Sequence, residues 1–234
     1  MSVLTSVGIL LLSMLIMAFL QLSPGIFSLL IHYTNGKFSK NKASDLCTFF
    51  ILGVETAIVL FFLAIYSILV SSPAIAQILD SDLFAWIMFS VFVALGCFVF
   101  FFYFRPSPGT KLFISRKLAH KYHHRTETVK TRSDAFMLGL SASVPELAFS
   151  LPLYLITATA IMHTFSNGSE RTGLIILFVL VVVLPLLILH GAANTGRTLA
   201  DFARFRFKNK TFFRCFIALF YFLLAFLVIS EAIL

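Results

Sequence analysis

Six long apolar runs, separated by polar segments, dominate the pattern along this chain. A membrane-spanning helix requires about 20 mainly apolar residues, and each run is of that order. The runs extend over Val3 to about Tyr33, Leu46 to about Val70, Leu83 to Phe104, Ala135 to about Met162, Gly173 to about Ala193, and Phe212 to Leu234. The pattern therefore predicts an all-α integral membrane protein with six transmembrane helices in one membrane domain, residues 1–234.

Lysine and arginine are concentrated in alternate loops between these runs. The basic loops follow the first, third and fifth runs and include Lys37–Lys42, Arg105–Arg132 and Arg197–Lys210. The loops after the second and fourth runs hold a single cation, Arg171. Cytoplasmic loops of membrane proteins carry an excess of Lys and Arg. We therefore expect the basic loops in the cytoplasm, both termini outside, and the chain in a plasma membrane, here a bacterial inner membrane.

The long basic loop, about residues 105–133, divides the chain into two halves, about 1–104 and 134–234. Each half has three predicted spans, so the halves would be inverted repeats with opposite membrane orientations. Their first spans both carry serine and proline in the middle, in Gln21-Leu22-Ser23-Pro24-Gly25 and in Ser143-Val144-Pro145-Glu146. Proline removes a backbone donor and breaks or kinks a helix. Broken helices at matching positions of inverted repeats indicate the central site of a transporter.

The two breaks would also place helix N-termini near the middle of the membrane. Ser23 and Ser143 are candidate N-caps, and Pro24 and Pro145 suit the first helical position. Free N–H groups and a positive dipole end favour an anion there, either a substrate carboxylate or the side chain of Glu146. The alternative is that each proline only bends its helix for packing.

Several further polar residues fall inside the predicted spans. Glu55 is central in the second run, and His190 and Asn194 share a helix face of the fifth. Intramembrane carboxylates are costly and mark ion pathways, proton relays or buried pairs. A carboxyl and an imidazole that titrate near neutrality would suit proton coupling. The alternatives are a neutral, hydrogen-bonded Glu55 and a His190 that serves packing.

Composition excludes several classes of protein. Apolar residues make up 59% of the 234 residues and charged residues 12%, which is too little charge for a soluble domain of this size. The net charge of +8 lies in loops between spans, so we expect no nucleic-acid partner. Cys47, Cys97 and Cys215 are far apart without metal-ligand spacing, and His120, His123 and His124 lack carboxylate or thiolate partners. We therefore expect no metal, no cofactor and no enzymatic activity.

This combination of features resembles the lysine-exporter superfamily. That superfamily includes small six-helix amino-acid and metal exporters and the membrane domains of thiol–disulfide reductases. Ser23-Pro24-Gly25 is similar to the exporters' first-helix Pro-Gly motif, and Ser143–Pro152 is similar to the reductases' fourth-helix proline segment. The reductases carry cysteine beside these prolines, where this chain has Gly25 and Glu146. The resemblance therefore implies a divergent member without the reductase thiols.

These observations favour a small proton- or cation-coupled transporter, an exporter of a small solute such as an amino acid or a metal ion. Its site would lie between the first and fourth helices, with Gln21, Ser23, Pro24, Gly25, Glu55, Ser143, Pro145, Glu146, His190 and Asn194 as binding residues. Membrane lipid would be a further partner, and a homo-oligomer is compatible with the sequence. The alternatives are a non-catalytic membrane scaffold on the same fold and, less favoured, a thiol-redox conduit.

Overall fold

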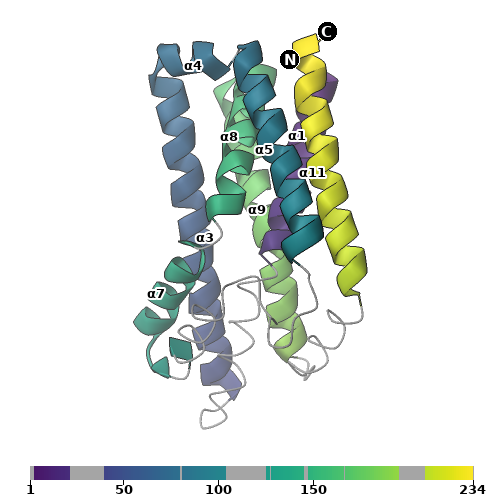
Figure 1. Cartoon of the computed structure of the whole chain (residues 1–234). Coiled ribbons are helices and arrows are strands. Elements are labelled where there is room, and N and C mark those ends of the chain that lie inside the picture. Colours follow the sequence, from purple (N-terminus) through teal and green to yellow (C-terminus); the bar gives the residue numbers. More distant parts are fainter. Residues whose placement is uncertain are drawn as a thin grey trace.

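The computed structural model describes most of the predicted spans. The described residues are 3–21, 40–79, 81–103, 125–126, 128–144, 147–165, 167–194 and 209–233. Within these ranges all regular structure is helical, and the long helices lie side by side in one bundle (Figure 1). The N- and C-terminal ends of the chain lie at the same end of this bundle, as an even number of crossings requires (Figure 1).

The helices follow the predicted apolar runs closely. They are α1 (Val3–Leu20), α3 (Lys40–Ser71), α4 (Pro73–Leu79), α5 (Asp82–Phe98), α7 (Arg132–Ala142), α8 (Leu147–Thr164), α9 (Gly168–Asn194) and α11 (Lys210–Ile233). A π-helical segment, η1 (Val99–Tyr103), continues α5. The second, third, fifth and sixth predicted spans thus correspond to α3, α5 with η1, α9 and α11.

In the described part of the chain, five helices are long and apolar enough to cross a membrane, and they correspond to every predicted span except the fourth. The fourth is divided into α7 and α8, and α8 alone is a shorter apolar helix. The first predicted span is described only as far as Gln21, so its second half lies outside the described residues. The all-helical, membrane-compatible architecture is therefore confirmed for the described part, whereas six spans and inverted repeats stay predictions.

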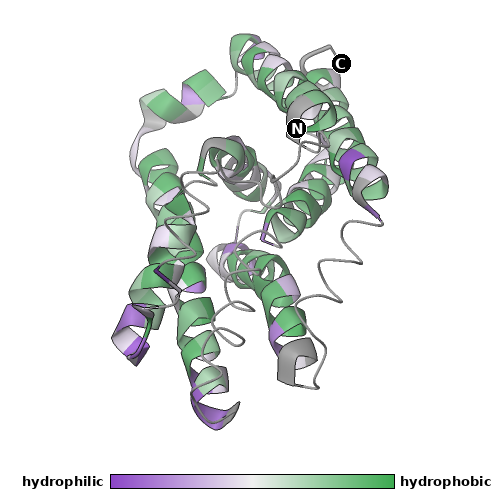
Figure 2. Ribbon diagram, turned by 60° about the horizontal axis from the view of Figure 1, so that its bottom comes forward, coloured by the Kyte–Doolittle hydropathy of each residue, from purple (hydrophilic) through white to green (hydrophobic). Residues whose placement is uncertain are grey.

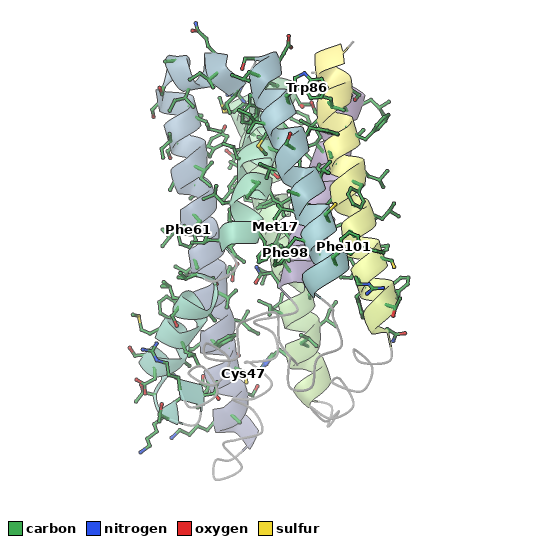
Figure 3. The ribbon with its side chains drawn as sticks, in the orientation of Figure 1. Met17, Cys47, Phe61, Trp86, Phe98 and Phe101 are labelled. Atoms are coloured by element: carbon green, nitrogen blue, oxygen red, sulfur yellow. The ribbon has the colours of Figure 1, made fainter. Side chains whose placement is uncertain are left out.

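The segment between the second and third spans is more ordered than expected. Residues 71–82 were predicted as a loop, but they contain the short helix α4, which lies across one end of the bundle (Figure 1). Ser81 then caps α5, because its hydroxyl accepts a hydrogen bond from the Phe84 N–H at 3.3 Å. Trp86 lies near the same end of α5 (Figure 3) and is half exposed, as aromatic residues at a membrane interface are.

Apolar side chains both fill the bundle and cover its outside. Phe50, Phe62, Phe92, Phe178 and Tyr221 are fully buried between helices. Exposed positions are also apolar, and hydrophobic colour runs along most of each helix while polar turns gather at helix ends (Figure 2). A soluble bundle would present a polar outer face instead. The outer surface is therefore suited to lipid.

Arg171 is the single cation in the two loops that follow the second and fourth apolar runs, and it has a structural role. Its Nε donates to the carbonyl of Phe165 at 2.5 Å, and its Nη2 donates to the carbonyl of Met162 at 3.0 Å. The last carbonyls of a helix have no partner within the helix, so a nearby guanidinium stabilises them. Arg171 thus caps the C-terminal end of α8, and its position does not conflict with the charge pattern of the other loops.

Candidate functional site

The centre of the candidate site is the interruption between α7 and α8. α7 ends at Ala142, and Ser143 is its C-cap residue with helical φ of −78°. Helical structure resumes at Leu147. Pro145 and Glu146, on which the predicted break depends, lie outside the described residues, as do Ser23, Pro24 and Gly25. The fourth span is therefore interrupted where the sequence predicts. Ser143 ends α7 as its C-cap, so the prediction that Ser143 is the N-cap of the following helix is wrong.

α7 packs against the first half of α3, and the backbones of the two helices are in direct contact. A Cβ atom built on Gly53 would overlap the carbonyl oxygen of Phe136, and one built on Gly139 would overlap that of Phe50. The two contacts are reciprocal and join parallel helices that share the motif Phe-x-Leu-Gly, at Phe50–Gly53 and Phe136–Gly139. Small residues at such crossings let helix backbones approach closely in membranes.

Charged and aromatic side chains extend this contact toward the basic end of α3. The Nε of Arg132 donates to the Asp45 carboxylate at 2.7 Å, and its guanidinium lies 5.2 Å from the centre of the Phe49 ring. The Asp45 partner raises the pKa of Arg132 above its ordinary value, mainly through this hydrogen bond. α7 and the first half of α3 thus form one packed unit.

α8, in contrast, is held by α1. The Thr157 hydroxyl donates to the Ser13 hydroxyl at 2.8 Å, and the Ser13 hydroxyl lies 2.7 Å from the carbonyl of Ile9 on its own helix. Both side chains are completely buried. Interhelical hydrogen bonds of this kind contribute about 0.6 kcal/mol on average in membranes. The interruption between α7 and α8 therefore joins a segment packed on α3 and a segment packed mainly on α1. α8 has a further contact with α3, where the ring centres of Tyr154 and Phe62 are 6.1 Å apart.

Further polar residues follow the same two faces at heptad spacing. On α1, Ser6 and Ser13 are seven apart, and the buried Gln21 follows eight residues later. On α8, Ser150 and Thr157 are seven apart and also buried. Because the helices are antiparallel and meet at Ser13 and Thr157, Gln21 and Ser150 fall at the same level. Gln21 thus belongs to a polar layer beside the interruption, and its role in binding stays a prediction.

Glu55 lies on the α9 side of α3. Ser44 and Phe62, eleven residues before and seven after it, share its helix face. The Ser44 hydroxyl is 3.4 Å from Nε2 of His190 on α9, and the Phe62 ring centre is 4.8 Å from that of Phe178 on α9. Glu55 is partly buried, and its carboxyl has no hydrogen-bond partner within the part of the chain that the structure describes.

The structure does not bring Glu55 and His190 together. His190 contacts Ser44, whose backbone is about 16 Å from that of Glu55 at about 1.5 Å per helical residue. His190 therefore lies near the Lys40 end of α3 rather than at mid-span, and a direct carboxyl–imidazole pair is excluded. Asn194 is the last residue of α9, at the same end. Neither residue is placed at the interruption of the fourth span.

Between Phe178 and His190, a proline interrupts the backbone hydrogen bonds of α9. Pro185 lies inside the helix and cannot donate to the carbonyl of Val181, four residues earlier. Glu55 lies between the two α3–α9 contacts, so this carbonyl and the Glu55 carboxyl fall in the same part of the bundle. Pro185 was not among the predicted site residues, although a proline within an apolar run is a visible signal.

The cysteines give no support to a thiol-redox site. Cys47, Cys97 and Cys215 lie on α3, α5 and α11, and none of the three forms a disulfide bond. Among the described residues, no group of three His, Cys, Asp or Glu side chains could hold a metal ion. The three predicted loop histidines, His120, His123 and His124, lie outside those residues.

Comparison with known proteins identifies no relative. No protein-family model, no curated protein and no solved structure matches this chain. The class of the protein therefore rests on its own residues.

Proposed function

We propose that this chain is a small proton- or cation-coupled membrane transporter, an exporter of a small solute such as an amino acid or a metal ion. The proposal rests on the interruption of the fourth span. The two pieces of this span, α7 and α8, are held mainly by different helices. Backbone groups at a helix end lack partners within the helix, and inside a membrane such groups are tolerated only within protein or beside a water-filled cavity.

The contacts on either side of the interruption support alternating access. α7 is packed on α3 through Gly53 and Gly139, whereas α8 is hydrogen bonded to α1 through Ser13 and Thr157. In the proposed cycle these two units rock about the interruption, and a solute bound there faces one side of the membrane and then the other. Gln21 and Ser143 would contribute polar groups, and Pro24 and Pro145 would shape the two breaks.

Glu55 is the coupling group in this proposal, with Glu146 beside the interruption. A partly buried carboxyl in mid-span, with no hydrogen-bond partner among the described side chains, is suited to bind and release a proton or cation. The charged and titratable residues on the elements around it are Arg132 and Asp134 on α7, Tyr154 and His163 on α8, and Glu170, Arg171 and His190 on α9. The membership in the lysine-exporter superfamily that the motifs imply is part of the same proposal.

The test is solute flux driven by a pH gradient in reconstituted vesicles, after a screen of radiolabelled amino acids and divalent metal ions. Glu55→Gln and Glu146→Gln each keep side-chain shape and remove titration, so each should lower pH-dependent flux at least about tenfold, the loss expected for one proton-transfer step. Glu170→Gln is the matched control, because Glu170 is exposed in the first turn of α9 and accepts a hydrogen bond from Asn167.

Unchanged flux and an unchanged pH profile in both variants would contradict the coupling role. Failure of every solute to move, by protein that is folded and correctly inserted, would favour the scaffold alternative. Loss of flux in Glu170→Gln as well would show that the substitutions act through folding, and the assignment of Glu55 and Glu146 would then be withdrawn.

A further inference from the structure

Arg214, near the start of α11, is a cation with no anionic partner among the described residues. Its guanidinium lies 5.0 Å from the centre of the Phe100 ring in η1. Its Nε is buried and has no hydrogen-bond acceptor, and no carboxylate forms an ion pair with it in the described part of the chain. A guanidinium is always charged and presents five donors in a planar fork. A buried N–H without an acceptor is costly, so a group that accepts hydrogen bonds would be stabilised at this position.

The surroundings favour an anion with apolar chains. α11 begins at Lys210, so the free N–H groups and positive dipole end of this long helix lie one turn from Arg214. The acidic residues of the two flanking helices, Asp82 on α5 and Glu231 on α11, are both at the opposite end of the bundle. The acidic residues of these two helices therefore do not neutralise the positive potential at the end of the bundle where Arg214 lies.

An exposed aromatic side chain lies next to the ring that the cation contacts. Phe101, the neighbour of Phe100 in η1, is 62% exposed. The Phe100 and Phe101 rings are in edge contact at 5.2 Å, so the apolar surface is continuous with the ring below Arg214. Figure 3 shows Phe98 and Phe101 at the lower end of α5, beside the lower part of α11. This surface is suited to acyl chains rather than to water.

We propose that Arg214, with Phe100 and the N-terminus of α11, binds the phosphate of an anionic phospholipid, whose chains lie over Phe101. The expected cytoplasmic position of this end agrees with the proposal, because anionic lipids and basic protein segments meet at that surface. The phosphate oxygens accept hydrogen bonds from the guanidinium, including its Nε. The proposal is independent of transport and holds equally for a scaffold.

The test measures lipid binding to the purified full chain by native mass spectrometry in detergent, with phosphatidylglycerol, phosphatidylcholine and inorganic phosphate as probes. Phosphatidylglycerol should bind tighter than phosphatidylcholine, and Arg214→Gln should weaken its binding about tenfold, as expected for a lost charge-assisted hydrogen bond near a charged surface. Arg214→Lys should retain part of the affinity, since it keeps the charge and loses the fork.

Arg132→Gln is the matched control, since it removes the same charge from the same end of the bundle. Arg132 already has the Asp45 carboxylate as partner, so its loss should change phosphatidylglycerol affinity less than twofold. Equal affinity of the wild-type protein for the two lipids would overturn the proposal even if Arg214→Gln did not fold. Equal weakening by Arg132→Gln, or full competition by inorganic phosphate, would also overturn it, by showing a general charge effect or a free-phosphate site.

Discussion

At the scale of single residues, polar side chains hold the ends of helices in this bundle. Thr131 and Asp134 form a capping box at the start of α7: the Thr131 hydroxyl accepts from the Asp134 N–H at 3.2 Å, and the Asp134 carboxylate accepts from the Thr131 N–H at 3.1 Å. The side chain of Thr131 and, after it, the N–H groups of Thr131 and Lys130 that donate to the carboxylate lower the pKa of Asp134 below its ordinary value. The cap therefore fixes where α7 begins, just outside the predicted fourth span.

The lowered pKa of Asp134 makes this cap sensitive to acid. A carboxyl whose pKa is lower in the folded state stabilises above its ordinary pKa, and the stabilisation is lost as the pH falls through the lowered value. Amide hydrogen exchange in the first turn of α7 should therefore increase below about pH 4, the ordinary carboxyl pKa. Asp134→Asn should abolish that pH dependence, and Thr131→Ala should raise exchange about fivefold at neutral pH, for a cap of about 1 kcal/mol. An unchanged acid profile in Asp134→Asn would refute the assignment.

Single residues were also the hardest feature to predict from the sequence. Glu55 stood out because a carboxylate is rare in an apolar run, and its mid-span position agrees with the structure. Ser13 and Thr157 were missed, because hydroxyls are common in membrane helices and their pairing depends on which helices are neighbours. Arg214 was not singled out in the sequence, since its lack of an ion-pair partner among the described residues is a three-dimensional property.

At the scale of elements, the contact between α3 and α7 is the most restrictive in the bundle. At both Gly53 and Gly139 an added methyl group would meet backbone, which cannot rotate away. At Gly96 it would meet the ring of Phe222, a side chain that can shift. The two crossing glycines are therefore the positions where helix packing leaves no room for adjustment.

Gly139→Ala should destabilise the protein by about 1–3 kcal/mol, the usual cost of overpacking. Gly173→Ala on α9 is the control, because nothing lies within 4 Å of a Cβ at that position. Reversible unfolding in mixed detergent would give both free energies of unfolding. Equal stability of Gly139→Ala and the wild-type protein would mean that α7 does not pack on α3 in this way.

Elements were predicted better than residues, because apolar length is a strong signal. The ends of α3, α5, α9 and α11 lie within a few residues of the predicted spans, apart from the polar start of α3. The short helix α4 and the π-helical η1 were not predicted, since neither changes the apolar pattern. The interruption of the fourth span was predicted from Pro145, and α7 and α8 end and begin on either side of it.

At the scale of the whole molecule, the arrangement of charges predicts which end of the bundle faces the cytoplasm. In a chain with its natural cysteines replaced, single cysteines at Ser71 and Ser169 should react with a membrane-impermeant thiol reagent on intact cells. A cysteine at Ser115, within the long basic loop, should react only after the membrane is permeabilised. Labelling at Ser115 alone in intact cells would reverse the orientation of all helices.

The hydrogen bonds of Arg171 have a consequence for how the chain is made. In the predicted orientation, insertion of the hairpin formed by α8 and α9 carries this guanidinium across the bilayer, against the tendency of cations to remain inside. Its bonds to the carbonyls of Phe165 and Met162 lie within the hairpin itself, so the guanidinium can keep these partners while the turn crosses. Hydrogen-bonded partners reduce the cost of taking a charge out of water, so the cap at the end of α8 would also favour translocation of the turn.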